Sequence, residues 1–215
     1  MKGLWATELE LRRRGFLHIA GVDEAGCGPI AGPVVAAAVV FAGRHRLTGL
    51  ADSKLTKPGD RERLFDLIYD RAVCIGIGAV DARTVDRINI LAAARAAMME
   101  AVSKLSLRPD LLLVDGRGVP GAPIPQRAIV KGDRTCACIA AASIIAKVTR
   151  DRIMNELDAQ YPGYGFARHK GYGTREHLER LIELGPCLEH RQSFAPVRAA
   201  RQGRLLLESR GERAP

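Results

Sequence analysis

Short apolar runs separated by glycine, proline and polar residues predict the strands of this chain. Such runs cover residues 17–22, 34–41 and 73–80. The first two flank a Gly- and Pro-rich loop and are expected to pair as a hairpin. Residues 111–114 are continuously apolar, which is typical of a strand covered on both faces. A last strand, 127–131, follows a loop that contains three prolines.

Helical periodicity fills the segments between and after these runs. The expected helices span residues 5–14, 61–70, 84–105, 135–160 and 174–184. Residues 162–172 are rich in Gly and Tyr and are predicted to form a loop. Strands come first, then strands alternate with helices, and helices close the chain. This order predicts an α/β fold, a mixed β-sheet flanked by helices, with a small C-terminal helical lobe.

Acidic residues stand where the apolar runs end. They are Asp23, Glu24, Asp115 and Asp133. A carboxylate is costly to bury unless it is paired or bound to a metal ion, so several strands that end in carboxylates predict a shared cation site. A single acid at a strand end is more often a turn or cap residue. Asp81 also follows an apolar run, and spacing alone does not exclude it from the site.

The adjacent pair Asp23 and Glu24 sets a condition on the backbone. Neighbouring residues of a regular strand point to opposite faces of the sheet. Both carboxylates can serve one site only if the chain turns there, and the following segment, residues 25–28, has the composition of a turn because two of its residues are glycine.

Composition and charge indicate what such a site acts on. The 215 residues are 47% hydrophobic, carry a net charge of +9 and have a pI of about 9.7. This charge favours a polyanionic partner, nucleic acid first and an anionic membrane surface second, although a basic surface can also be merely solubilising. No apolar run is long enough for a transmembrane helix, and the N-terminus lacks the order of a signal peptide, so we expect a cytoplasmic protein that does not act at a membrane.

Carboxylates on a basic protein fit the hydrolysis of phosphodiesters. Two divalent ions roughly 4 Å apart activate a water, stabilise the charge of the phosphate and support the leaving oxygen. Such hard ions prefer oxygen ligands. The five cysteines have no zinc-like spacing and are expected to be reduced thiols.

Longer motifs surround these acids. They include Gly21-Val-Asp-Glu-Ala-Gly-Cys-Gly-Pro, Asp52-Ser53-Lys54, Val114-Asp115-Gly116, Lys131-Gly132-Asp133, Ile139-Ala-Ala-Ala-Ser-Ile-Ile-Ala-Lys, His169-Lys-Gly-Tyr-Gly-Thr and His190-Arg-Gln-Ser-Phe-Ala-Pro-Val. In this order they closely resemble the motifs of bacterial ribonuclease HII, over roughly residues 17 to 198. Each fragment alone is moderately specific, whereas the whole series in register is not a coincidence.

The resemblance implies a ribonuclease H-like fold and a metal-dependent endonuclease. Such an enzyme cuts the RNA strand of RNA–DNA hybrids and cuts at single ribonucleotides in duplex DNA, leaving 5′-phosphate and 3′-hydroxyl ends, and so serves ribonucleotide removal in DNA repair. The resemblance also implies Mg²⁺ or Mn²⁺, with a two-metal mechanism. It places the catalytic and metal-binding roles on the same four acids, Asp23, Glu24, Asp115 and Asp133, and leaves Asp81 out.

The resemblance also divides the chain. Residues 1–16 are expected to be an N-terminal extension, residues 17–198 the catalytic domain with its helical lobe, and residues 199–215 a flexible basic tail. No coiled-coil heptads are evident, so a monomer is expected.

The substrate-reading turn departs from the family pattern. The family has Gly-Arg-Gly after the acid pair, where the backbone and the Arg recognise the 2′-hydroxyl and a nearby phosphate. This chain has Gly26-Cys27-Gly28. The glycines leave the backbone open to close approach by a nucleotide. Cys27 cannot replace the planar donor array of a guanidinium, which puts recognition of the RNA–DNA junction in question.

The remaining substrate-binding candidates lie outside this turn. Tyr172 matches the family tyrosine that stacks on the sugar beside the scissile ribonucleotide; without the resemblance it reads as an ordinary loop tyrosine. Lys54, Lys147 and Lys170 are candidate phosphate contacts. Ser143 lies one helical turn before Lys147, so the two can share a face.

Two other functions stay open at this point. The chain could be a ribonuclease that cuts hybrids alone, or a weakened nucleic-acid-binding protein on the same fold, because Cys27 replaces the usual Arg. The intact set of four acids argues against a pure binder, which gains nothing from carboxylates that face phosphates.

Overall fold

The computed structural model describes residues 3–44, 47, 49–50, 58–119 and 121–209, with the side chains of 58 and 204–209 excepted. Its internal contacts divide the chain into two units. The sheet unit consists of Met1–Ala25, Val35–Ala79 and Ala94–Thr149. The helical unit consists of Gly26–Val34, Val80–Ala93 and Arg150–Pro215.

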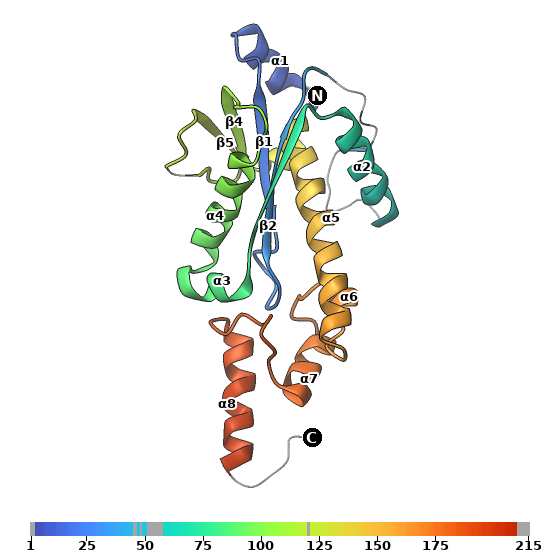
Figure 1. The fold of residues 1–215 in the computed structure, drawn as a ribbon, viewed down its shortest axis with the longest axis vertical. Helices are drawn as coiled ribbons and strands as arrows, with labels where there is room; N and C mark the ends of the chain where they lie inside the picture. The colour runs from blue at the N-terminus through green and yellow to red at the C-terminus, as the bar shows by residue number, and fades with distance from the viewer. Residues whose placement is uncertain (1–2, 45–46, 48, 51–57, 120, 210–215) are drawn as a thin grey trace. The chain divides into compact units, whose positions relative to one another are not determined.

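The sheet has five strands in the order β3-β2-β1-β4-β5 (Figure 1). Their bounds are β1 Ile19–Ala25, β2 Val34–Val40, β3 Cys74–Val80, β4 Leu111–Asp115 and β5 Gln126–Ile129. Strand β1 pairs antiparallel with β2 and parallel with β4, and β4 pairs parallel with β5. The predicted mixed sheet and the predicted hairpin of the first two strands are therefore confirmed.

The helices follow the predicted order. Their bounds are α1 Ala6–Arg13, α2 Pro58–Arg71, α3 Ala82–Ile88, α4 Ile90–Ser103, α5 Ala137–Gln160, α6 Phe166–His169, α7 Arg175–Leu184 and α8 Ala195–Ser209, with a 3₁₀ turn η1 at Gly132–Arg134. The predicted loop 162–172 contains the short helix α6. Helix α8 carries the expected basic tail as far as Ser209 in helical form.

The prediction of one long helix over residues 84–105 is wrong. Asn89 has a positive φ of 68° with an extended ψ of 164°, and this non-helical backbone conformation ends α3. Its side-chain oxygen then accepts hydrogen bonds from the amides of Leu91 and Ala92, at 3.0 and 3.1 Å, and caps α4. One residue therefore both ends a helix, through its backbone, and begins the next, through its side chain.

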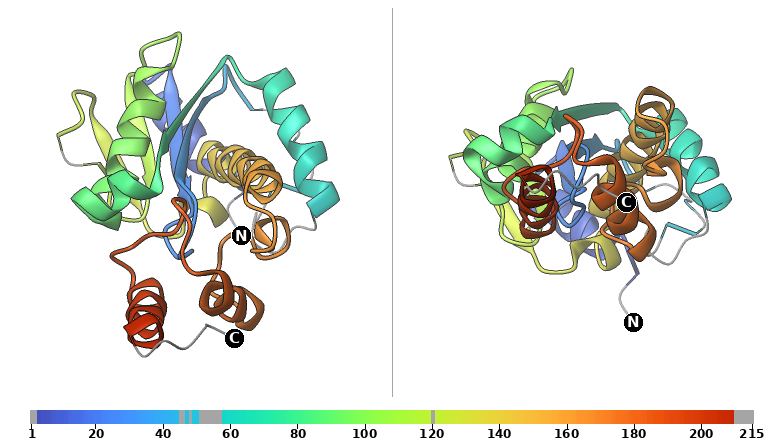
Figure 2. Two further views of the ribbon diagram at one scale, coloured as in Figure 1. Left: turned by 60° about the horizontal axis from the view of Figure 1, so that its bottom comes forward. Right: turned by 90° about the horizontal axis from the view of Figure 1, so that it is seen from below.

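Helices cover both faces of the sheet, with α4 on one face and α2 and α5 on the other (Figure 2). Two glycines of β3 let α4 approach closely, because a Cβ at Gly76 or Gly78 would meet the carbonyl oxygens of Ala101 or Ala97 at about 2 Å. The core that includes α5 combines the alanines of this helix with larger side chains such as Phe41, Ile144 and Ile145.

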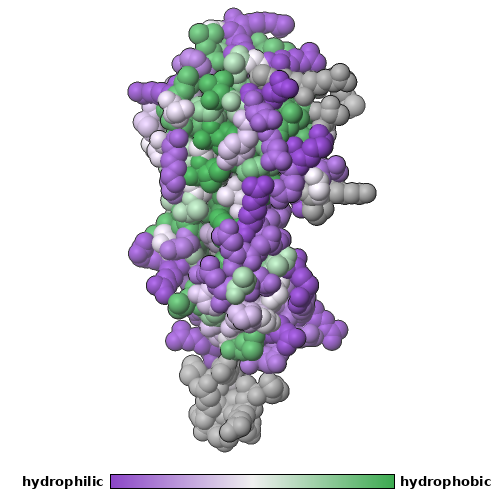
Figure 3. Space-filling model, turned by 45° about the vertical axis from the view of Figure 1, so that its right-hand side comes forward, coloured by the Kyte–Doolittle hydropathy of each residue, from purple (hydrophilic) through white to green (hydrophobic). Residues whose placement is uncertain are grey.

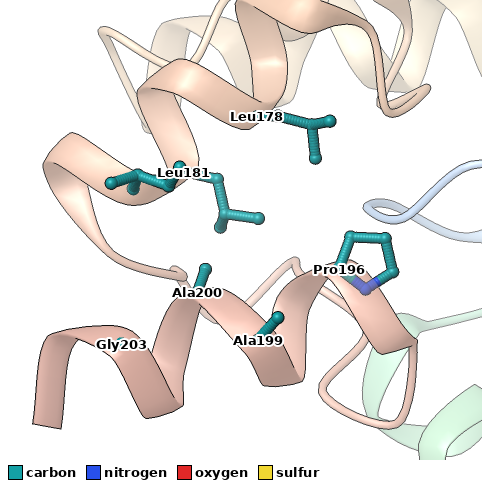
Figure 4. Close-up of a pocket in the computed structure, with 7 residues that line it drawn as sticks. Leu178, Leu181, Pro196, Ala199, Ala200 and Gly203 are labelled. Atoms are coloured by element: carbon teal, nitrogen blue, oxygen red, sulfur yellow. The ribbon is translucent and has the colours of Figure 1, made fainter. Parts of the chain in front are cut away.

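The helical unit has two smaller apolar clusters. One contains Met154, Leu157 and Phe166, and the other joins Leu181 of α7 to Val197 of α8. An apolar pocket of about 580 Å³ lies between α7 and α8 (Figure 4). Hydrophilic side chains are spread over the face shown in Figure 3, with smaller apolar areas between them. None of the helices in the described part of the chain is long and apolar enough to cross a membrane.

Candidate active site

Strand β1 carries the first two acids into the sheet unit. Asp23 pairs with Ala37 of β2 and Glu24 with Ala36, so both residues still lie in regular strand. The turn expected at the pair is therefore not found there, since the chain leaves the strand only after Ala25. The charge of Glu24 still acts on the Asp23 carboxyl, so the two acids share one neighbourhood without that turn. Asp23 is buried, with 6% of its surface exposed, and its carboxylate accepts a hydrogen bond from the amide of Glu24 at 2.8 Å.

A glycine determines how closely α5 approaches this strand. A Cβ at Gly21 would lie 2.1 Å from the carbonyl carbon of Cys138, so only glycine permits the contact. From Gly21 to Asp23 the strand advances about 6.8 Å, and from Cys138 to Ser143 the helix advances by a similar distance, about 7.5 Å. The contact at Gly21 thus brings Ser143 level with Asp23, and the Ser143 hydroxyl forms a hydrogen bond with the Asp23 carboxylate.

Strand β4 places the third acid beside the first. Val22 of β1 pairs with Val114 of β4, and the two strands are parallel, so Asp115 ends its strand next to Asp23. Neighbouring strands lie about 4.8 Å apart, which puts both carboxylates at the same end of the sheet.

The fourth acid is linked to Asp115 through the backbone. The Asp115 carboxylate accepts a hydrogen bond from the amide of Gly132 at 2.7 Å. Lys131 has a left-handed backbone, with φ of 57°, which turns the chain into η1. Asp133 in this turn is 4% exposed. The local turn after β5 therefore brings a buried carboxylate to the end of β4.

The electrostatics of Asp23 indicate a cation site. Burial raises the pKa of Asp23 well above its ordinary value, and the charges of Glu24 and Asp115 raise this pKa further. The hydrogen bonds from Ser143 and from the Glu24 amide oppose this shift. A divalent cation would reverse the effect, since it favours the ionised form of each carboxylate around it.

These oxygen donors fit a hard divalent ion such as Mg²⁺ or Mn²⁺ in their chemistry. Within the described ranges, however, no three His, Cys, Asp or Glu side chains are arranged so that they could already hold a metal ion. The like charges of these carboxylates repel one another until a cation joins them, so an open arrangement is expected before the ions bind.

Asp81, the rival acid, has a local structural role. Its carboxylate accepts a hydrogen bond from the amide of Thr84 at 2.7 Å and caps α3. This hydrogen bond lowers the pKa of Asp81, opposite to the shift at Asp23.

The turn Gly26-Cys27-Gly28 belongs to the helical unit, where a buried arginine holds it. The Arg191 guanidinium donates to the carbonyl oxygens of Gly26 at 2.6 Å, Cys27 at 3.3 Å and Pro29 at 2.7 Å. It also donates to the carbonyl of Gly32 from two nitrogens. Carbonyls that point to a buried guanidinium are drawn inward, which favours an outward direction for the amides of the turn.

A second buried arginine holds the other end of the same loop. Arg150 of α5 donates to the carbonyls of Ala31, Pro33 and Lys170 at 2.9 to 3.1 Å. We name Arg150 and Arg191 together the arginine cradle. Arginines in a basic chain are expected on the surface, so the sequence marks these two only through family motifs. Arg191 stands in His190-Arg-Gln-Ser, and Arg150 stands three residues after Lys147 in the motif that begins at Ile139.

Tyr172 lies beside the turn in the helical unit. A Cβ at Gly28 would be 3.6 Å from its ring atom Cε1. The Tyr172 side chain is exposed, with 46% of the residue surface accessible, so its ring face is available to a ligand.

The lysine candidates differ in their surroundings. Lys147 is half-buried on α5, one turn beyond Ser143. The Lys170 ammonium donates a hydrogen bond to the side-chain oxygen of Asn155. Lys54 lies outside the described residues.

The comparison with known families agrees with this geometry. The family model described as Ribonuclease HII matches residues 20–197. The chain belongs to the ribonuclease HII family. The predicted resemblance is thereby confirmed, as are the ribonuclease H-like fold and the expectation of a ribonuclease H enzyme.

Individual relatives of the ribonuclease HII family support the assignment. Ribonuclease HII of Geobacter metallireducens is 52% identical over 197 residues, which cover 92% of each chain. The ribonuclease H2 structure from Pyrococcus horikoshii OT3 has a TM-score of 0.73 at 28% identity and covers 86% of this chain and 98% of that one. Bst-RNase HIII in complex with Mn²⁺ has a TM-score of 0.68 at 18% identity and covers 90% of this chain and 72% of that one, which is a likeness of fold.

Proposed function

We propose that this chain hydrolyses the RNA strand of RNA–DNA hybrids and cuts at single ribonucleotides in duplex DNA, with divalent ions held by Asp23, Glu24, Asp115 and Asp133. The products carry 5′-phosphate and 3′-hydroxyl ends. The observation that carries the proposal is the buried Asp23 carboxylate, whose pKa is raised by neighbouring acids at one end of the sheet.

Two of the four acids are oriented by hydrogen bonds before any ion binds in this proposal. Bound Mg²⁺ or Mn²⁺ ions supply an activated water and stabilise charge on the phosphate. Asp23 is fixed in direction by Ser143 and by the Glu24 amide, so its oxygens keep one orientation. Asp115 is fixed in the same way by the amide of Gly132. Ligands that are held before the substrate arrives reduce the reorganisation required during the reaction.

The helical unit reads the substrate in this proposal. The amides of Gly26-Cys27-Gly28 bind the 2′-hydroxyl and an adjacent phosphate, and the Tyr172 ring stacks on the neighbouring sugar. Lys170 of the same unit contacts phosphates, as do Lys147 of the sheet unit and Lys54; such contacts position nucleic acid without reading its sequence. We assign the reaction to a monomer in the cytoplasm, and all four acids come from one chain's sheet unit.

A hybrid-only ribonuclease is the second candidate function. Cys27 supports it, because a thiol supplies none of the paired donors that an Arg offers to a phosphate. The arginine cradle supports the first candidate, since it holds the backbone of the turn whatever the side chain at position 27 is.

The first experiment compares two labelled substrates, a DNA duplex with one ribonucleotide and a long RNA–DNA hybrid, in Mg²⁺, Mn²⁺ and EDTA. We expect both to be cut, and EDTA to stop the cutting. Asp115→Asn should lower turnover by at least about a thousandfold while binding to the hybrid persists. Asp110→Asn is the matched control, because Asp110 directly precedes β4, at the end of the strand opposite Asp115. Its carboxylate accepts hydrogen bonds from the amides of Leu17 and His18.

The outcomes separate the candidates. Cutting of the hybrid alone would favour the second function. Unchanged turnover in Asp115→Asn would remove this residue from the metal site.

A further inference from the structure

Three histidines are buried together in the helical unit, and none has a role in the reaction proposed above. His169, His177 and His190 are 8%, 0% and 1% exposed. The rings of His169 and His177 are stacked, with centroids 4.1 Å apart. His177 and His190 face each other through their Nε2 atoms at 3.1 Å. Buried imidazoles with such defined partners hold their neighbours in place.

The hydrogen bonds assign one proton to each ring along a directed chain. The carbonyl of Tyr172 can only accept, so His177 donates to it from Nδ1, at 2.8 Å. His177 Nε2 is then an acceptor and receives the Nε2 proton of His190. His190 Nδ1 accepts in turn from the amide of Cys187 at 3.0 Å, and the Cys187 thiol lies 3.2 Å from the same nitrogen. Every donor meets an acceptor only when both rings are neutral.

His169 completes the hold on Tyr172 from the other side. Its backbone carbonyl accepts from the Tyr172 amide at 2.9 Å. Its ring donates from Nε2 to the carbonyl of Tyr164 at 2.8 Å and accepts from the Gly171 amide at Nδ1, at 3.2 Å. The amide of Thr174 is a second donor to the Tyr172 carbonyl. Both backbone groups of Tyr172 are therefore fixed.

The environment keeps the chain of rings neutral. Burial lowers the pKa of His177 to about 4 and that of His190 to about 3. The charge that His169 would carry lowers both pKa values further, whereas Glu176 raises the pKa of His177. At the pH of the cell the hydrogen bonds keep the direction described above.

We propose that His177, oriented by His190, is a positioning residue that fixes the Tyr172 carbonyl and thereby the direction in which the Tyr172 ring meets the sugar of the substrate. The inference rests on the proposed role of Tyr172 as the stacking residue. The fixed backbone of Tyr172 sets where the side chain begins and which space its rotamers can reach, and the ring lies beside Gly28. His177 does not touch the substrate.

The test compares two replacements of His177 on the single-ribonucleotide duplex. His177→Leu removes the donor to the Tyr172 carbonyl, and we expect kcat/KM to fall about tenfold, mainly through KM. His177→Asn restores a donor near the position of Nδ1 and should recover most of the loss. Leu181→Ala, a buried core change on the same helix, is the matched control: it should lower thermal stability and leave KM unchanged.

A double-mutant cycle with Tyr172→Ala distinguishes positioning from general destabilisation. In the Tyr172→Ala background, His177→Leu should raise KM no further. If Tyr172→Ala raises KM but the two effects are independent, the inference about His177 is overturned and the role of Tyr172 stands. If Tyr172→Ala leaves KM unchanged, both are overturned.

Nitrogen-15 NMR of the wild-type imidazoles tests the same inference without any variant. At pH 7 we expect neutral His177 with its proton on Nδ1 and neutral His190 with its proton on Nε2. A charged His177, or one that carries its proton on Nε2, would overturn the proposal.

Discussion

The protein buries charge in two regions, and it does so in opposite ways. In the sheet unit, Asp23 lies against the like charges of Glu24 and Asp115. In the helical unit, Arg150 and Arg191 are almost fully buried, and backbone carbonyls accept their hydrogen bonds. An added cation would stabilise the like charges of the first region, whereas backbone carbonyls already stabilise the positive charges of the second.

The difference shows which part is rigid before the substrate arrives. A guanidinium has five N–H donors in a planar array, and the carbonyls of one loop surround the array of Arg191. Burial lowers the pKa of Arg191 to about 10, which leaves it charged at neutral pH. The loop from Gly26 to Gly32 is thus held by a fixed positive charge, whereas the Asp23 carboxyl is surrounded by groups of like charge.

Removal of the cradle charge should have the largest effect. Arg191→Met leaves the carbonyls of Gly26, Pro29 and Gly32 buried without their donor, and we expect a loss of about 3 kcal/mol or more in the free energy of unfolding. Urea denaturation measures it. Arg175→Met, at a side chain 93% exposed, is the control and should change stability by less than about 0.5 kcal/mol. Equal losses of unfolding free energy in both variants would contradict the role of Arg191 in stabilising the loop.

Restoring the family residue in the turn should have the next largest effect. Cys27→Arg adds a charge-assisted phosphate contact, so preference for a single ribonucleotide over a long hybrid should rise about tenfold. The ratio of kcat/KM for the two substrates measures this preference. Cys27→Ser is the matched control, since it adds no charge. An unchanged ratio in Cys27→Arg would mean that the backbone of the turn does the reading alone.

Asp23→Asn tests the acidic region through stability instead of activity. A pKa raised by folding means that the stability this carboxyl contributes is present at low pH and is lost as the pH rises through the folded pKa. In EDTA at pH 8, the variant should therefore be more stable than the wild type by about 1 kcal/mol, or about 3 °C in Tm. The gain should shrink at pH 5, and Mg²⁺ should stabilise the wild type more than the variant. A lower Tm for the variant at pH 8 would contradict this account.

Asp81→Asn should have the smallest effect. Asn caps a helix about as well as Asp, so stability should change by less than about 0.5 kcal/mol and cleavage should stay within about twofold of wild type. A hundredfold loss of turnover would place Asp81 in the chemistry.

The sequence predicted those parts of the molecule that depend on local pattern. The apolar runs marked all five strands, and the acids at their ends could be identified because parallel neighbours end at the same edge of a sheet. The break at Asn89 was missed, since the Ala-rich periodicity continues across it and only the backbone conformation of one residue interrupts it.

The cradle could not be predicted because its contacts are distant in the sequence. Arg191 binds the carbonyl of Gly26, 165 residues earlier. Backbone carbonyls are common to every residue, so no side-chain pattern marks the acceptors of a buried arginine. The roles of the four acids and of the substrate-reading residues remain predictions that the experiments above address.

The contact at Gly21 has a consequence for interpreting sequence variation. Any side chain there would separate α5 from β1 and move Ser143 away from Asp23, although residue 21 has no functional group of its own. In a screen of all single substitutions for activity, position 21 should appear as intolerant as a metal ligand. Such a screen would therefore need a parallel measurement of protein abundance, to distinguish a variant in which α5 no longer packs on β1 from one that has lost a catalytic group.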